Sequence, residues 1–579
     1  MRQRFHDAIA AAFGVEHAEV DPVLRRSQQE RFGDYQANVA MSLAASLGSS
    51  PRDVAAAIVE HLDVADVCDD VVIAGPGFVN LTLGPEYLAA SLAAVEADHG
   101  LGVEPAAAPE TVVVDYSGPN VAKEMHVGHL RSTVIGDALV RVLELLGHRV
   151  IRQNHLGDWG TPFGMLIEHL VDLGAQVTVD TLSIGDLDGF YRQAREKFDA
   201  DPGFAERARR RVVALQGGDE TTLRLWRLLV DESKRHFEAA YQALGVTLTD
   251  ADVRGESFYN PLLGDTAAEL EAKGLLRVDA GALCAFPPGF TRRDGEPLPL
   301  IVRKSDGGYG YDATDLAAVR FRVRELGGQR LVYVVDARQS QHFSMVFAVA
   351  VQAGWLGEGR RAEHVAFGSV LGPDLRPFKT RSGDTVKLID LLDEAVERAA
   401  AVVADKSPEL DPGAGAQVAR AVGVGAVKYA DLANDRLRDY VFDWDRMLAM
   451  DGNTAPYLQY AHARIRSIFR RAVAEGAPPS AGGDGSGIVI GERAERTLAL
   501  ELLSLDEAVQ ATAALLQPHR LCTYLFDLAG AFTRFYEQCP VLRADTPEQR
   551  RSRLALCDLT ARVLGSGLGL LGIQAPERM

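Results

Sequence analysis

The chain has 579 residues, 47% of them hydrophobic and 24% charged, and its formal net charge at pH 7 is −19. This length predicts several domains, and the balance of apolar and charged residues excludes a disordered protein. No apolar run approaches the roughly 20 residues that cross a bilayer, and the amino terminus lacks a signal-peptide core, so we expect a cytoplasmic protein without a membrane segment. The acidic balance argues against a broadly basic nucleic-acid-binding surface, although arginines cluster locally at 207–211 and 464–471.

The five cysteines are scattered along the chain and form no C-x-x-C pair. An odd number without that spacing argues against a zinc ribbon and against a disulfide framework. We therefore expect reduced, buried thiols and no zinc site. We also expect no organic cofactor. The cysteines are Cys68, Cys284, Cys522, Cys539 and Cys557.

Residues 1–105 are predicted to form a small α/β module. An amphipathic opening with Phe5, Ile9 and Phe13 on one face precedes a strand-like run at Val71–Leu83. A linker rich in Ala and Pro at Gly100–Pro109 marks the boundary of this module.

Residues 106–390 alternate between strand and helix patterns, which predicts an α/β domain of the Rossmann type, a doubly wound parallel sheet with helices on both faces. Between about 180 and 293 this rhythm is lost, and the segment is expected to be a mainly helical insertion. Strand patterns occur at Thr111–Val114, Arg149–His155, Leu300–Arg303, Leu331–Val335 and His364–Phe367.

Residues 391–579 are predicted to form an all-α C-terminal domain. Helical periodicity is clearest at Leu388–Lys406 and Leu498–Leu515, while Gly476–Gly487 has only loop composition.

The most distinctive stretch is Asp115–His129, which lies in the first turn of a predicted β-α-β unit. Nucleotide phosphates bind at such turns, because free backbone N–H groups and the helix dipole point toward them. Gly128 allows close approach of a nucleotide, and His126 and His129 offer hydrogen-bond donors to phosphate oxygens. Two histidines at this spacing are also compatible with a metal site, but the sequence places no third ligand nearby.

The segment Ser117–Thr133 resembles the arginyl version of the signature of class I aminoacyl-tRNA synthetases. The similarity continues through Asn154–Thr161, Asp336–Gln339, Gly452–Tyr460 and Ala575–Met579, so it covers nearly the whole chain. The resemblance implies a bacterial-type arginine–tRNA ligase that activates L-arginine with ATP to arginyl-adenylate and transfers it to the 3′ end of tRNA(Arg). ATP would enter with Mg²⁺ as substrate, no metal would be resident in the protein, and a monomer is the default expectation.

The same resemblance implies an ATP site. Its residues would be Lys123, His126, Gly128, His129 and Lys379. Phosphate charge would be stabilised by Lys123, His126, His129, Lys379 and Arg381. Synthetases of this class usually carry a Lys-Met-Ser-Lys-Ser loop, whereas Pro377–Gly383 retains Lys379 and Arg381 but lacks the second lysine. Many arginyl enzymes share this departure, and Lys123 would compensate, because a compact ammonium can meet a phosphate from either side.

The arginine pocket implied by the resemblance comprises Asp115, Ser117, Asn120, Tyr311, Asp315 and Gln339. Tyr311 and Asp315 lie four residues apart, so on a helix they share one face, where they would bind the guanidinium. Asn120 would hold the α-amino and carboxylate end. A planar cation with five donors requires acceptors at fixed positions, which suits these residue types. Without the resemblance, Asp315 would be interpreted as a helix N-cap and Tyr311 as a core residue.

Contacts with tRNA are implied for two regions. In the N-terminal module, Asn80 matches a position that contacts a base of the D-loop, and Phe78 and Gln36 are further candidates. An amide there would read a base edge while an aromatic ring supports its face. In the C-terminal domain, Tyr457 and Met579 match positions near the anticodon. We thus assign D-loop binding to 1–105, catalysis to 106–390 and anticodon binding to 391–579.

Four alternatives remain at this point. A non-catalytic, tRNA-binding paralogue would show damaged ATP or arginine positions, which are intact here. A cysteinyl enzyme would need zinc ligands, and a glutamyl enzyme would need cationic residues in a pocket that is acidic in this chain. A metal-dependent hydrolase would have to be built on the two histidines alone.

Overall fold

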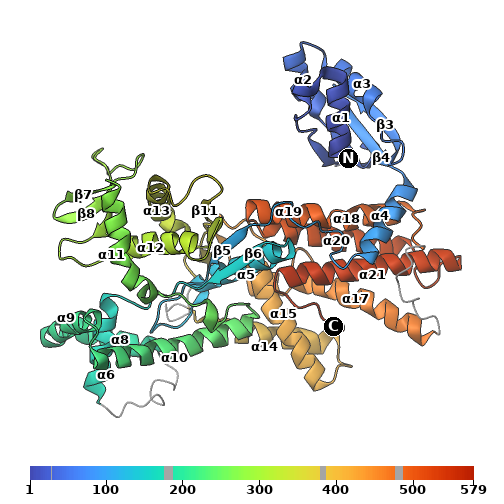
Figure 1. Cartoon of the computed structure of the whole chain (residues 1–579). Coiled ribbons are helices and arrows are strands. Elements are labelled where there is room, and N and C mark those ends of the chain that lie inside the picture. The colour runs from blue at the N-terminus through green and yellow to red at the C-terminus, as the bar shows by residue number, and fades with distance from the viewer. Residues whose placement is uncertain (28, 175–186, 379–385, 476–486) are drawn as a thin grey trace. The chain divides into compact units, whose positions relative to one another are not determined.

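The computed structural model describes residues 1–27, 29–174, 187–378, 386–475 and 487–579 (Figure 1). These residues divide into two compact units. The first contains 1–103, 465–506 and 527–564, and the second contains 104–464, 507–526 and 565–579.

The first unit contains the predicted N-terminal α/β module. Its sheet has the order β1-β2-β4-β3 and is antiparallel throughout. The elements are α1 (Arg2–Phe13), η1 (Val15–His17), β1 (Leu24–Arg26), η2 (Glu30–Phe32), β2 (Tyr35–Ala37), α2 (Val39–Leu47), α3 (Pro51–His61), β3 (Cys68–Ala74), β4 (Phe78–Leu83) and α4 (Pro85–Ala97). Phe5 and Ile9 are buried in its core, as predicted. The run predicted as one strand is a hairpin, because Gly75 and Gly77 adopt positive φ and turn the chain between β3 and β4.

The second unit contains a four-stranded, fully parallel sheet in the order β6-β5-β10-β11. Its strands are β5 (Thr111–Asp115), β6 (Arg149–Gln153), β10 (Arg330–Tyr333) and β11 (Arg361–His364). Val113 and Leu331 pack on one face against helices α12 (Tyr311–Arg324) and α13 (Ser340–Gln352). Helix α5 (Val127–Leu145) connects β5 to β6 and contacts both strands. The predicted parallel α/β architecture is confirmed.

Two strand predictions need correction. Leu300–Arg303 forms β9, but this strand belongs to an antiparallel sheet of order β7-β8-β9 rather than to the parallel sheet. Its residues alternate between buried and exposed, as expected for a sheet with one solvated face. The strand expected at His364–Phe367 instead spans Arg361–His364. It is an edge strand with β10 as its one neighbour, so polar residues are tolerated in it.

The segment between β6 and β9 is mainly helical. It contains α6 (Thr161–Leu173), α8 (Leu187–Ala200), α9 (Pro202–Gln216), α10 (Glu220–Leu244), η3 (Asp250–Asp252), α11 (Glu256–Ala272), β7 (Leu276–Asp279) and β8 (Ala282–Ala285). The arginine cluster at 207–211 is largely engaged within this segment. Arg207 and Arg211 both pair with the buried carboxylate of Glu168, which favours a structural role for them.

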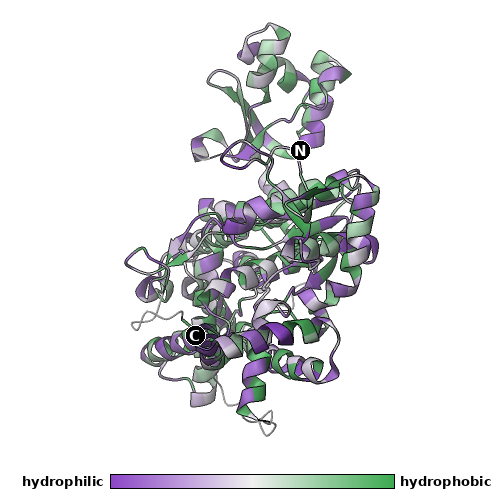
Figure 2. Cartoon of the chain, turned by 90° about the vertical axis from the view of Figure 1, so that its left-hand side faces the viewer, coloured by the Kyte–Doolittle hydropathy of each residue, from purple (hydrophilic) through white to green (hydrophobic). Residues whose placement is uncertain are grey.

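The C-terminal residues are helical apart from one short strand. They form α14 (Leu388–Lys406), α15 (Pro412–Leu432), β13 (Tyr440–Val441), α16 (Trp444–Met447), α17 (Ala455–Ala474), α18 (Arg493–Leu502), α19 (Leu505–Leu515), α20 (His519–Gln538) and α21 (Pro547–Leu570). Strand β13 pairs with β12 (Val370–Leu371). Figure 2 shows hydrophobic and hydrophilic residues alternating along the helices, as expected when each helix buries one face.

The run predicted as one helix at Leu498–Leu515 is two helices. At the break, the Ser504 N–H donates to the Glu501 carbonyl at 3.0 Å, an i−3 bond of the kind that closes the last turn of a helix. Within the predicted loop Gly476–Gly487, residues 476–486 lie outside the described part of the chain.

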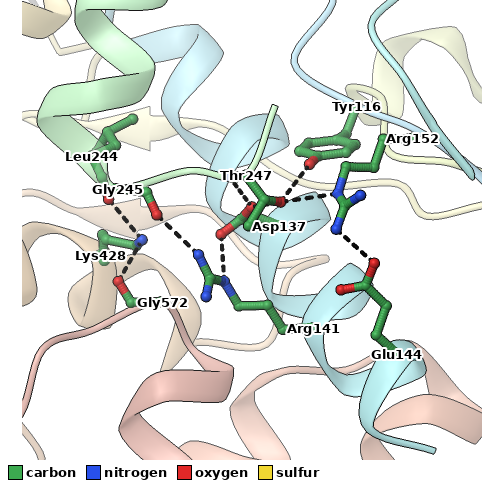
Figure 3. A network of polar contacts seen from close by, with 10 residues as sticks. All are labelled: Tyr116, Asp137, Arg141, Glu144, Arg152, Leu244, Gly245, Thr247, Lys428 and Gly572. Carbon is green, nitrogen blue, oxygen red and sulfur yellow. Dashed lines mark hydrogen bonds and ion pairs between the residues drawn. The ribbon is translucent and has the colours of Figure 1, made fainter. Parts of the chain in front are cut away.

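Helix α5 is fixed by a buried polar network (Figure 3). The Asp137 carboxylate accepts hydrogen bonds from the backbone N–H of Thr247 at 2.7 Å and from Arg141 Nε at 2.8 Å. Lys428 of α15 is fully buried, and its Nζ donates to the carbonyls of Leu244 at 2.9 Å and Gly572 at 2.7 Å. Burial lowers the pKa of Lys428 to about 8. The network therefore joins α5 to the end of α10, to α15 and to the C-terminal tail.

A substitution at Gly572 tests this network. Gly572 has φ +66°, and a Cβ at this position would lie 2.5 Å from Lys428 Nζ. We expect Gly572→Ala to lower the free energy of unfolding by about 2–4 kcal/mol, because it combines left-handed strain with a lost hydrogen bond from a charged donor. Denaturant unfolding measures this change. Gly569→Ala is the matched control, since a Cβ there meets nothing within 4 Å. Equal stability of the two variants would contradict the prediction.

Candidate active site

The two histidines of the predicted nucleotide site lie at the N-terminus of α5, and backbone donors fix their rings. His126 is the N-cap residue, and its Nδ1 accepts the N–H of Gly128 at 3.0 Å. The N–H of His126 in turn donates to Nδ1 of His129 at 3.1 Å. The ring centroids are 4.1 Å apart. Each Nδ1 is therefore an acceptor, which places the ring proton on Nε2.

Both imidazoles are neutral at physiological pH. Burial lowers the pKa of His126, and burial together with the neighbouring His126 lowers the pKa of His129 to about 3. Each ring thus offers one Nε2–H donor. Gly128 is exposed between them, and a Cβ at that position would lie 2.7 Å from the His126 ring. A larger residue at position 128 would displace this imidazole.

Lys123 lies close to the same helix terminus. Its Nζ is 4.4 Å from the centroid of the Tyr191 ring, and its charge contributes to the lowered pKa of both histidines.

The predicted basic loop is only partly described. Lys379 and Arg381 lie outside the described residues. On one side of them, Phe378 stacks on Phe442 with centroids 4.6 Å apart. On the other side, the carbonyl of Val386 accepts the N–H of Val127 at 3.0 Å. The chain that follows the loop thus runs beside the histidine turn.

Asn120 and Ser117 differ in their surroundings. Asn120 is exposed and lies beside Gly157, where a Cβ would be 2.2 Å from its Oδ1. Ser117 is buried, and its hydroxyl is 2.8 Å from the Tyr241 hydroxyl. Asn154 donates to the same Tyr241 oxygen at 2.9 Å. Asn120 is therefore accessible to a ligand, whereas Ser117 has partners inside the protein.

Asp115 lies at the end of β5 and is paired within the protein. Its Oδ2 accepts a hydrogen bond from Arg322 of α12 at 2.7 Å. The Arg322 side chain is 1% exposed, and the ring of Tyr333 lies 4.8 Å from its guanidinium carbon. The pair ties α12 to the end of the central strand.

Tyr311 and Asp315 both lie on α12, one turn apart, as predicted. The N-cap of this helix is Gly310, so Asp315 does not serve as the cap. Tyr311 is 67% exposed at the start of the helix, whereas the Asp315 side chain is 17% exposed. Asp315 Oδ2 lies 2.6 Å from Nε2 of His342 on α13.

Glu256, at the start of α11, is not marked by any pattern in the sequence. Burial and the charges of Asp158 and Asp315 raise the pKa of Glu256 to about 7. A carboxyl group held near its titration point beside another carboxylate is well suited to receive a cation. No local spacing marks this residue, because its two neighbours come from distant segments.

Gln339 and the candidate tRNA contacts occupy separate places. Gln339 is exposed at the end of η4 (Ala337–Gln339), directly before α13.

In the N-terminal module, Gln36 Nε2 donates to Asn80 Oδ1 at 2.8 Å across paired strands. Phe78 lies two residues before Asn80 on β4, and thus on the same face. The structure therefore brings these three residues together.

The two C-terminal candidates belong to the second unit. The Tyr457 ring lies 5.8 Å from the Phe526 ring. Met579 packs against an apolar cluster that includes Val403 and Val418, so the last residue is anchored on α14 and α15.

Within the described ranges, no three His, Cys, Asp or Glu side chains are arranged to hold a metal ion. No helix of the described part is long and apolar enough to cross a membrane.

Comparison with known proteins gives matches to three family models along the chain. Residues 1–83 match the arginyl tRNA synthetase N-terminal domain, residues 93–444 match the catalytic domain of class I (R) tRNA synthetases, and residues 458–579 match the DALR anticodon-binding domain. These matches, together with the sheet and the helices described above, confirm the predicted fold class.

Relatives and solved structures agree with these matches. The chain is 56% identical to an arginine–tRNA ligase of Thermobifida fusca and 51% identical to one of Synechococcus elongatus, covering 100% of this chain and 99% of each relative. The arginyl-tRNA synthetase of Thermus thermophilus superposes with a TM-score of 0.84 at 27% identity, over 100% of both chains. That of Plasmodium falciparum gives 0.83 at 29% identity, over 100% of this chain and 98% of the other. The comparisons support neither a non-catalytic paralogue nor another amino-acid specificity. The chain therefore belongs to the arginyl-tRNA synthetases, the class I enzymes that ligate arginine to tRNA.

Proposed function

We propose that His126, His129 and Lys123 stabilise the phosphate charge that develops while arginine is activated. The observation that carries this proposal is the hydrogen bonding of the two imidazoles. Each Nδ1 accepts a backbone N–H, so the Nε2–H groups are the donors available to ATP oxygens. Preorganised donors of this kind stabilise developing charge without reorganisation during the reaction.

The arginine carboxylate attacks the α-phosphorus of ATP, and the bond to the bridging oxygen of pyrophosphate breaks. A terminal ribose hydroxyl of tRNA(Arg) then attacks the arginyl carbonyl carbon, and AMP leaves. No protein nucleophile takes part, so positioning and charge stabilisation supply the catalysis. ATP enters with Mg²⁺ as substrate. Lys379 and Arg381 would approach the phosphates from the loop whose end pairs beside His126.

The substrate side chain binds among carboxylates in this proposal. Asp315 and Glu256 receive the guanidinium, with Tyr311 and Gln339 at the rim and Asn120 at the α-amino and carboxylate end. Asp115 and Ser117 act on the pocket through their protein partners, Arg322 and Tyr241. A buried acceptor set of this kind requires a ligand with matching donors.

Recognition of tRNA is assigned to two surfaces. Gln36, Phe78 and Asn80 of the N-terminal module would contact the D-loop, because an amide pair beside an aromatic ring suits an unstacked base. Tyr457 and Met579 would lie near the anticodon. The corresponding regions are 1–105 for the D-loop, 106–390 for catalysis and 391–579 for the anticodon.

The overall reaction is tested by ATP–pyrophosphate exchange with arginine, run with and without total tRNA. We expect exchange with arginine only when tRNA is present, and none with lysine or glutamate. Absence of exchange in both conditions, from folded protein that still binds tRNA, would contradict the proposal.

The role of His129 is tested by two substitutions. His129→Ala removes the Nε2–H donor, and we expect adenylate formation to slow by roughly 10²- to 10³-fold with little change in tRNA affinity. His129→Asn is the matched variant, because its side-chain oxygen can still accept the His126 N–H while the Nε2 donor is lost. Pre-steady-state ATP consumption and a tRNA filter-binding assay measure the two effects. Equal losses in both assays, or full activity of the Asn variant, would disprove this role.

The raised pKa of Glu256 predicts that arginine binding depends on pH. Its pKa is raised to about 7, so below that pH the carboxyl is protonated and no longer attracts a cation. We expect arginine affinity to be complete above pH 7 and to fall by up to about tenfold for each pH unit below it. Calorimetric titration with arginine alone between pH 5.5 and 8.5 measures this trend. In Glu256→Gln, affinity should be lower at pH 8 and nearly constant with pH, and a persistent slope would assign the titration to another group.

A further inference from the structure

His342 lies between two carboxylates at the rim of the proposed arginine pocket. It occupies the first turn of α13, and its Nε2 is 2.6 Å from Asp315 Oδ2. Its Nδ1 is 3.3 Å from Asp312 Oδ1. Because each ring nitrogen faces a carboxylate, both nitrogens act as hydrogen-bond donors. This is the hydrogen-bonding pattern of an imidazolium.

The charged form of this ring is favoured by its neighbours. Burial alone would lower the pKa of His342, but the hydrogen bonds to Asp312 and Asp315 raise it to about 9. His342 therefore carries a positive charge at neutral pH, unlike the two histidines of α5. Charge-assisted hydrogen bonds are shorter and stronger than neutral ones, in agreement with the contact to Asp315.

The imidazole has little freedom to move. Asp312 is itself held, because its Oδ2 accepts the N–H of Ile301 at 2.9 Å. The rings of Tyr311 and Phe343 lie edge-on to His342, with centroids 5.1 and 5.2 Å away. The side chains of His342, Asp312 and Asp315 are 15%, 13% and 17% exposed. Asp315 is thus held by an imidazolium whose other contacts, with Asp312, Tyr311 and Phe343, keep the ring in place.

We propose that His342 is a positioning residue that orients Asp315 for the guanidinium of arginine. This inference rests on the proposed role of Asp315. The imidazolium occupies Oδ2 of Asp315 and turns the other carboxylate oxygen toward the substrate. Its positive charge also offsets the negative charges of Asp312, Asp315 and Glu256, which share this partly buried site.

Two substitutions separate the contacts that His342 makes. The amide of His342→Gln reaches the position of Nε2 and can donate to Asp315, whereas the shorter His342→Asn reaches only the position of Nδ1. For His342→Asn we expect the KM for arginine to rise roughly 10- to 100-fold, as for a lost hydrogen bond to a charged group. For His342→Gln we expect a rise of about threefold or less, because the neutral donor is retained. The KM for ATP and the melting temperature should stay near those of the wild type in both variants.

Two controls accompany these variants. His148→Asn replaces another partly buried histidine, whose Nδ1 accepts the N–H of Glu110 before β5, and it should leave both KM values unchanged. Asp315→Asn tests the proposed pocket itself and should raise the KM for arginine more than any substitution of His342. If Asp315→Asn has no effect, the pocket assignment fails.

The remaining outcomes decide the role of His342. If Asp315→Asn weakens arginine binding but His342→Asn does not, the pocket stands and the positioning role is overturned. The positioning role is also overturned if the Asn and Gln variants lose arginine affinity equally. If His342→Asn does not fold, Asp312→Asn replaces it, because it removes the carboxylate that anchors Nδ1. An increase of about two- to fivefold in the KM for arginine is then expected, and an unchanged value would overturn the proposal.

Discussion

The arrangement of the proposed arginine pocket depends on one buried ion pair, between Asp115 at the end of β5 and Arg322 of α12. An unpaired charge at such depth costs several kcal/mol, so neither partner can leave without a large penalty. The pair therefore locks α12 against the central strand. Because Tyr311, Asp312 and Asp315 lie on the same helix, this contact also fixes their positions relative to the sheet. The ion pair at the end of β5 thus sets the position of the helix to which we assign the substrate side chain.

A second constraint fixes the phosphate side of the site. The turn between β5 and α5 contains two non-glycine residues with left-handed backbone, Ser117 at φ 73° and Ala122 at φ 61°. A serine hydroxyl from a helix holds each of them. The Ser117 N–H donates to the Ser132 hydroxyl and the Ala122 N–H to the Ser233 hydroxyl, both at 2.9 Å. Such conformations persist where surrounding contacts over-determine them, and they are typical of functional turns. The turn that leads to the two histidines is therefore held by side chains of two helices.

Local patterns in the sequence predict the elements whose character is itself local. The helix Leu388–Lys406 has the predicted bounds, and β5 and β10 lie where apolar β-branched runs place them. The pattern at Leu300–Arg303 predicts a strand correctly but not its sheet, because the choice of pairing partner depends on residues far away in the chain. Glu256 and His342 escape sequence reasoning for a related reason. The pKa of Glu256 is shifted by Asp158 and Asp315, and that of His342 by Asp312 and Asp315. These carboxylates come from other segments of the chain, so no spacing around Glu256 or His342 reveals them.

Selectivity for a guanidinium would follow from the charge balance of the proposed pocket. Asp315 and Glu256 are largely removed from water, and the shared site already makes ionisation of Glu256 less favourable. A cation relieves that penalty, whereas a neutral side chain would leave the carboxylates unpaired, and unpaired buried acceptors reject ligands by roughly 10⁴-fold or more. Charge alone would still admit lysine. An ammonium is a point charge with strong hydration, whereas a guanidinium presents donors in a plane, so acceptors in a fixed orientation distinguish the two. In our proposal, His342 holds Asp315 at one angle, which would convert attraction for any cation into selectivity for arginine.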